Sequence, residues 1–413
     1  MRFPAIDAIS TVTFVEEVKE QRSKARGLPP IERKSFLFAL LVGMNDYQVS
    51  NPKDRIYGLL GLVEDINLQP EVLPIDYSLT DEEVFIAAAK YIIEGYGRLE
   101  LLSLLRPGQL VLSKYDLPSW CPDWTINFNK DSVVKASRLL QHALRDAYLP
   151  VWESSAKISF GPERNAMTVA GIAVDTIKDI AGEFDWERVH WFQFFALTKP
   201  GADFTLHLAD EYSESELESI RRWCKLSQAS NPALGATLEG TPICSLDFQR
   251  SLLREVQNHV PCLREDSAID KRLDAFWRTL MVEPSLDHNE RTVRCKTMFN
   301  AFMCWNDFNI PGNVWDDQFF LEFTIPFRRK VSGVAHGRQF FVSNNGNMGL
   351  APYGTKEGDV VCVLLGYGCP VTLRPEGDHY LVVGETYIHG FMRGEAYKEV
   401  ENGTFVEEDF ILR

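Results

Sequence analysis

The first clear pattern along the chain is a helical spacing of apolar residues after position 55. Residues three and four apart lie on one face of a helix, so this spacing predicts an amphipathic helix with a buried stripe. The stripe consists of Ile56, Leu59, Leu60 and Val63. A second helix is predicted from residue 81 to about residue 94, because Thr80 and Glu83 form a capping-box pattern in front of it.

The polar residues in front of the first stripe allow two interpretations. Asn51 suits a helix N-cap and Pro52 the first helical position. Asp54 would then lie favourably at the positive end of the helix dipole. Alternatively, Asp54 is a catalytic acid at the mouth of a pocket. We favour the capped helix, because it accounts for each residue type in the stretch.

The pattern changes near residue 150 to a period close to two, which is typical of strands. Residues 151–182 alternate on both sides of a turn at 161–165, and they predict a β-hairpin. Helical segments return between 183 and 329. The last segment, 330–413, has short apolar stretches separated by turn sequences, which predict a small barrel or curled sheet.

The combined pattern predicts an α+β fold. Its parts are a mostly helical body, an interposed β-hairpin and a small C-terminal β-barrel-like module. The predicted boundaries are 1–150 for a helical region with the first motifs, 151–182 for the hairpin, 183–329 for a second helical region and 330–413 for the β module. The module carries apolar runs such as VVCVLL and YLVV, so we expect it to pack on the helical body.

Composition and charge narrow the function classes. With 45% hydrophobic and 24% charged residues, the chain has the composition of a folded protein with a core. Its formal net charge of −15 argues against nucleic acid or a membrane as partner, since anionic partners need clustered Lys and Arg. The eight cysteines include no C-x-x-C pair. Scattered cysteines favour a reducing compartment, and no secretory signal is recognisable, so we expect a cytoplasmic protein.

Six short motifs follow one another in order between residues 50 and 390: NPKDRIYGLLGL, IDYSLTDEEVF, LELLSLL, LPSWCPDW, GDVVCVLLG and VGETYIHG. Together they resemble the region downstream of the HET domain in fungal heterokaryon-incompatibility proteins. We find no run like WIDxxCINQ, so the N-terminal HET domain itself is expected to be missing. In that family, the HET domain is implicated in triggering cell death during non-self recognition. For the remaining region the resemblance implies no established reaction.

The segment ETYIHG is the first candidate for acid–base chemistry. On a strand, Glu385, Tyr387 and His389 would share one face, because side chains alternate. A carboxylate, a phenol and an imidazole side by side suit catalytic proton transfer, with His389 as the acid–base group and Glu385 orienting it. The alternative is a polar strand face that hydrogen-bonds to the helical body.

The segment LPSWCPDW is the second candidate, and its prolines preclude a regular helix. Trp120, Asp123 and Trp124 would form either an aromatic wall that binds substrate or a brace for the helical block. Cys121 has no local base or positive charge to make it a thiolate, so we interpret it as a packed residue. No histidine pair has metal-binding spacing and no phosphate-binding loop is present, so we expect neither a metal nor a cofactor.

Two functions are compatible with these observations. The first is a non-enzymatic interaction or regulatory protein that binds a protein partner. The second is a fungal enzyme that modifies a small molecule in secondary metabolism, with its site where the helical body meets the β module. A deep apolar pocket beside residues 120–124 and 385–389 would favour the enzyme, and a filled surface would favour the interaction protein.

Overall fold

The structure is a computed structural model. It describes residues 37–38, 40–41, 49–60, 73–97, 99–105, 110, 113–125, 157–161, 166–183, 222–223, 226, 268–282, 295–296, 298–299, 327, 330–331, 334–335 and 337–413. The helical segments predicted at the end of 1–150 and across most of 183–329 lie outside these residues and stay predictions.

Four helices have defined bounds in the described part of the chain: α3 (Asp54–Leu60), α4 (Asp81–Tyr96), α11 (Ala268–Met281) and α15 (Glu395–Glu401). A 3-10 helix, η3, spans Glu100–Leu104. The capping box predicted from Thr80 and Glu83 is confirmed in front of α4, and Gly97 ends that helix in the left-handed conformation at a φ of 64°. None of the helices described combines the length and the apolar character that crossing a bilayer requires.

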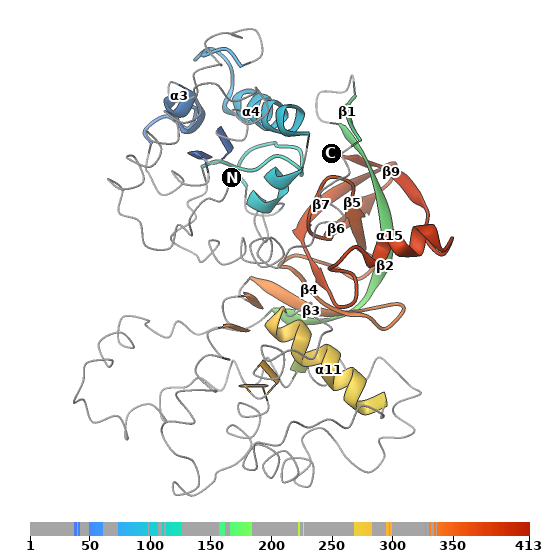
Figure 1. The fold of residues 1–413 in the computed structure, drawn as a ribbon. Helices are drawn as coiled ribbons and strands as arrows, with labels where there is room; N and C mark the ends of the chain where they lie inside the picture. The colour runs from blue at the N-terminus through green and yellow to red at the C-terminus, as the bar shows by residue number, and fades with distance from the viewer. Residues whose placement is uncertain are drawn as a thin grey trace, which may run out of the picture. The chain divides into compact units, whose positions relative to one another are not determined.

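Among the described residues, the strands are β1 (Ile158–Phe160), β2 (Met167–Glu183), β3 (Arg338–Ser343), β4 (Met348–Pro352), β5 (Val360–Leu364), β6 (Val371–Glu376), β7 (His379–Glu385), β8 (Tyr387–Ile388) and β9 (Glu407–Leu412), and Figure 1 shows their arrangement. The predicted mostly helical body is therefore wrong: the described structure is sheet-rich, with a barrel-like sheet in its C-terminal region. The physical reason is β2, which has 17 residues and pairs with β9 and β3 far later in the sequence. Local apolar periodicity carries no information about such distant partners.

The chain forms two compact units, each assembled from distant segments. The first unit contains Met1–Val174, Asp359–Glu385 and Gly394–Arg413, and the second contains Asp175–Gly358 and Thr386–Arg393. Strand β2 passes from the first unit into the second. The predicted division into four consecutive segments stays a prediction, since much of 1–150 and 183–329 lies outside the described residues.

The sheet of the first unit closes on itself. Its strands follow the order β5-β6-β7-β9-β2, and β5 also pairs with β2. Most of these pairs are antiparallel, whereas β7 and β9 are parallel, with Tyr380 opposite Leu412. β1 adds to the edge of β2, with Ile158 opposite Val169. A closed order leaves few free strand edges, as in a small barrel.

A buried ion pair joins the first two strands of this barrel. Arg374 on β6 donates from Nε and Nη2 to the two carboxylate oxygens of Asp359, which precedes β5, and both distances are 2.9 Å. The Asp359 side chain is 2% exposed and the Arg374 side chain 13% exposed. Two parallel hydrogen bonds of this kind fix both charges in one geometry.

The second unit has an open antiparallel sheet. The second half of β2 pairs with β3, β3 with β4, and β4 with the short strand β8. Gly349 on β4 lies opposite Ile388 on β8 and opposite Phe341 on β3. Helix α11 lies against β4. This arrangement brings the residues around Tyr387 beside α11.

Candidate functional site

The NPKD stretch leads into helix α3, which begins at Asp54 and not at Pro52, the predicted first helical position. Asn51 accepts a hydrogen bond from the Lys53 amide on its side-chain oxygen, at 3.1 Å. The backbone then closes tight turns, with the Asp54 amide donating to the Asn51 carbonyl at 2.9 Å. The Asp54 carboxylate has a different partner: the Tyr77 hydroxyl donates to it at 2.7 Å. The first motif is therefore held to the second motif, IDYS.

Further contacts join these two motifs. The Tyr57 hydroxyl donates to the backbone carbonyl of Asp76 at 2.9 Å, and the Lys53 ammonium donates to the carbonyl of Tyr77 at 2.9 Å. The rings of Tyr57 and Tyr77 meet edge to face, with centroids 5.2 Å apart. These contacts hold the segment in front of α4 against the start of α3.

The LPSWCPDW motif is buried. Trp120, Asp123 and Trp124 all have nearly inaccessible side chains, and the Trp120 ring contacts Phe160 at a centroid distance of 5.5 Å. One carboxylate oxygen of Asp123 accepts from the amide and hydroxyl of Thr125, at 2.9 and 2.7 Å. The other oxygen accepts from the hydroxyl of Ser113 at 2.9 Å. The Asp123 carboxylate is thus engaged in local hydrogen bonds.

Cys121 and Ser119 belong to the same motif and have buried or hydrogen-bonded side chains. Burial, reinforced by the charge of Asp123, raises the pKa of the Cys121 thiol well above its usual value, so the thiol stays protonated. The hydroxyl of Ser119 accepts from the Val382 amide at 2.8 Å and donates to the carbonyl of Arg413. The motif is therefore tied to β7 and to the residue after β9.

Glu385 ends β7 in the first compact unit, and its side chain is buried. The hydroxyl of Tyr367, also buried, donates to the Glu385 carboxylate. Burial, followed by the negative charge of Glu385, raises the pKa of Tyr367 well above its usual value. Tyr367 therefore stays protonated and serves as a donor. This partner has no signal in the sequence, because Tyr367 belongs to the turn between β5 and β6.

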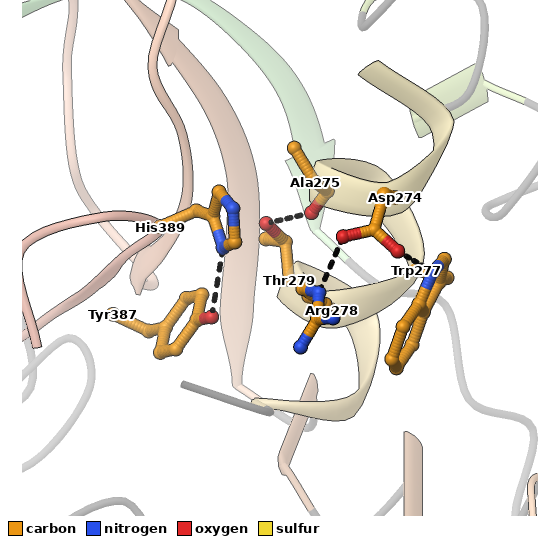
Figure 2. Close-up of polar contacts among 7 residues, drawn as sticks. All are labelled: Asp274, Ala275, Trp277, Arg278, Thr279, Tyr387 and His389. Atoms are coloured by element: carbon orange, nitrogen blue, oxygen red, sulfur yellow. Dashed lines mark hydrogen bonds and ion pairs between the residues drawn. The ribbon is translucent and has the colours of Figure 1, made fainter. Parts of the chain in front are cut away.

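Tyr387 and His389 belong to the second unit and face α11 (Figure 2). The Tyr387 hydroxyl lies 3.4 Å from Nδ1 of His389. The backbone amide of His389 donates to the Met348 carbonyl at 2.9 Å, which fixes the residue at the end of β8. The structure thus brings together two of the three predicted catalytic residues, and it gives Glu385 a different partner in the other unit.

Helix α11 presents a charged pair and a hydroxyl near His389, and Figure 2 shows their arrangement. Nε of Arg278 lies 2.5 Å from one carboxylate oxygen of Asp274, and the Trp277 indole donates to the other at 2.9 Å. The Thr279 hydroxyl donates to the Ala275 carbonyl at 2.7 Å. The i, i+4 spacing of Asp274 and Arg278 is readable in the sequence, but their proximity to His389 is not.

The environment of His389 keeps its imidazole neutral. Burial, followed by the positive charge of Arg278, lowers the pKa of His389 from 6.5 to about 4, while the carboxylate of Asp274 opposes the change. At neutral pH the ring can accept a proton but carries no charge. In the part of the chain that the structure describes, no three His, Cys, Asp or Glu side chains form a group suited to hold a metal ion.

This burial makes the stability of the protein depend on pH. The pKa of His389 is about 4 in the folded chain and near 6.5 when unfolded, so the unfolded state binds more protons between these values. Stability is therefore full above pH 6.5 and falls as the pH decreases toward 4. We expect a loss of about 2 kcal/mol between pH 7.5 and pH 5 from this residue, measured as the free energy of unfolding in urea.

The variant His389→Gln should lack this part of the pH dependence, because glutamine does not titrate. An unchanged slope in His389→Gln would contradict the burial of a neutral imidazole.

Comparisons with known proteins agree with the motif resemblance. Residues 328–410 match the family model of the Het-6 beta-barrel domain. The chain is 26% identical over 404 residues to "Heterokaryon incompatibility protein 6, OR allele" of Neurospora crassa, and the match covers 91% of this chain and 53% of the relative. The chain thus spans about half the length of this curated relative. No solved structure matches significantly. The C-terminal region of the chain thus matches the Het-6 beta-barrel domain, and most of the chain is similar to a fungal heterokaryon incompatibility protein.

Proposed function

We propose that the chain is an interaction or regulatory protein of heterokaryon incompatibility, which acts in the cytoplasm and binds a protein partner during non-self recognition. The observation that carries this proposal is the match to heterokaryon incompatibility protein 6 over 91% of the chain. The name of the relative gives a role in heterokaryon incompatibility, and the match covers 53% of that protein. The described cysteines are buried and form no disulfide, which supports a reducing compartment.

The contacts of the motif residues support a non-catalytic role. Asp54, Asp123 and Glu385 are the carboxylates of three motifs, and each accepts a hydrogen bond from a side chain of the same compact unit. A general acid or base has to reach the substrate within hydrogen-bond distance. Carboxylates engaged in such hydrogen bonds are instead suited to hold loops and strands in place.

A second candidate is an enzyme that modifies a small molecule, and the observation that favours it is the pair of Tyr387 and His389. The neutral imidazole of His389 lies 3.4 Å from the phenol of Tyr387, and a neutral imidazole is suited to accept a proton. In this candidate His389, which is partly exposed, is the base, and Tyr387, whose side chain is fully buried, orients it. Trp120 and Trp124 are buried, so they serve this candidate only as structural residues.

One genetic experiment separates the two candidates. The gene is deleted from one partner of an incompatible fungal pair, and the deletion strain is complemented with the wild-type chain or with His389→Gln. Growth of the fused cells is the measurement. Under the interaction proposal the deletion relieves growth arrest, and both the wild type and His389→Gln restore it. Restoration by the wild type alone, with folded His389→Gln present at equal amount, would favour the enzyme. Arrest that is unchanged in the deletion strain would contradict the proposal.

A further inference from the structure

Two large apolar side chains are exposed in the segment in front of α4. Ile75 is 55% exposed and Tyr77 54% exposed. Among the described residues, Val406 is the other large apolar side chain that is more than half exposed, at 74%, and it has no such neighbour within three residues. Single exposed apolar residues are common on protein surfaces, whereas neighbouring exposed apolar residues are one feature of interaction sites.

The segment that carries this pair is rigidly held. The Tyr77 hydroxyl is bonded to Asp54, and its backbone carbonyl accepts from Lys53. The Asp76 carboxylate accepts from the amide and the hydroxyl of Ser78, at 2.8 and 2.7 Å. An aromatic side chain that is fixed before binding loses little conformational entropy when a partner covers it.

Carboxylates border the pair. Asp54 and Asp76 lie within the same network of hydrogen bonds, and Asp81 and Glu82 follow in the first turn of α4. The two hydrogen bonds from Ser78 lower the pKa of Asp76, so this carboxylate stays charged. Lys53 is the nearby cation, and it is engaged with the Tyr77 carbonyl. An apolar centre with an anionic rim is complementary to a segment that is apolar and basic.

We propose that Ile75 and Tyr77 form the centre of a docking surface for a basic, apolar peptide segment of a protein partner. This proposal rests on the proposed interaction role and specifies the chemistry of the partner. Tyrosine is among the residues that contribute most to binding when a partner covers them. The anionic rim disfavours nucleic acid, whose phosphates would be repelled.

The test is a binding measurement with the purified full chain and a fluorescent peptide that alternates lysine and leucine. A peptide that alternates glutamate and leucine is the charge control. We expect the basic peptide to bind and the acidic one to fail. Ile75→Lys should weaken binding about tenfold or more, as expected for a residue at the centre of a surface. Val406→Lys makes the same change in charge and polarity at an exposed position outside this segment and should leave binding near the wild-type value.

Tyr77→Ser provides a second variant, and urea unfolding checks that each protein is folded. Equal loss in Ile75→Lys and Val406→Lys would overturn the proposal, because a general charge effect would then explain binding. Equal binding of the two peptides, or no binding of the basic one, would also overturn it.

The genetic assay keeps this proposal separate from the proposed function. If the wild-type chain and Ile75→Lys restore incompatibility equally, the docking surface is wrong and the proposed function stands. If deletion of the gene has no effect while peptide binding depends on Ile75, the surface stands and the proposed function is wrong.

Discussion

Asp359→Ala is expected to destabilise the protein by about 3–5 kcal/mol, as the loss of one partner from a buried ion pair does. The guanidinium of Arg374, 13% exposed, would keep its positive charge but lose the carboxylate that now accepts two hydrogen bonds at 2.9 Å. Urea unfolding of the full chain at neutral pH measures the difference. The double variant Asp359→Leu with Arg374→Met should recover part of the loss, since it leaves no buried charge behind.

A surface ion pair in the same unit is the matched control. Lys157 and Glu407 lie 2.6 Å apart, but their side chains are 70% and 40% exposed. Water screens such a pair, so Glu407→Ala should change the stability little. Equal effects of Asp359→Ala and Glu407→Ala would show that burial does not decide the contribution of the Asp359–Arg374 pair.

Gly349→Ala is expected to cost about 3 kcal/mol through overpacking. A Cβ atom on Gly349 would lie 2.3 Å from the ring of Phe341 and 2.3 Å from the backbone carbonyl oxygen of Tyr387. Both neighbours belong to strands that pair with β4, so relieving the clash means separating the sheet. Thermal and urea unfolding of the variant measure the loss.

The same substitution should have the opposite sign at Gly58 in helix α3. A Cβ atom there would have no neighbour within 4 Å, and alanine favours a helix over glycine. Gly58→Ala is therefore expected to stabilise the protein by about 0.5–1 kcal/mol. A Gly349→Ala variant that unfolds like the wild type would contradict the close approach of β3, β4 and β8.

Local chemistry made the helix starts predictable. In the capping box of α4, the Glu83 amide donates to the Thr80 hydroxyl at 3.2 Å, and the Thr80 amide donates to the Glu83 carboxylate at 3.0 Å. The two residues are three positions apart in the sequence, so their types and spacing are enough to predict the start of the helix. The same holds for Asn51 and α3. By contrast, the partner of Asp54 is Tyr77, and no local rule connects them.

The sheet was not predictable in the same way. The residues of β2 alternate as a strand should, and the sequence indicates a hairpin there. The partners of β2 that set its length, β9 and β3, come from the far end of the chain. Strand pairing at such separation depends on which surfaces meet in the folded protein, and a single sequence does not display that.

The candidate site was likewise predictable only where its residues are close in the sequence. Tyr387 and His389 are two residues apart, so their proximity was predictable. Glu385 was expected on the same strand face, but β7 ends at Glu385 and β8 begins at Tyr387, with Thr386 between them. This interruption breaks the simple alternation on which the prediction depended. Arg278 and Asp274 reach the vicinity of His389 through the packing of α11, which the sequence does not reveal.

The closure of the barrel by β9 has a consequence for how the protein is made. During translation β2 leaves the ribosome early, because it ends at Glu183, whereas its partner β9 ends at Leu412. At about 5–20 residues per second, the growing chain waits on the order of tens of seconds for that partner. The apolar side chains of β2, buried in the finished barrel, have no β9 to pair with during this interval. The newly made chain is therefore a natural client for chaperones, and its yield should depend on them more than its final stability does.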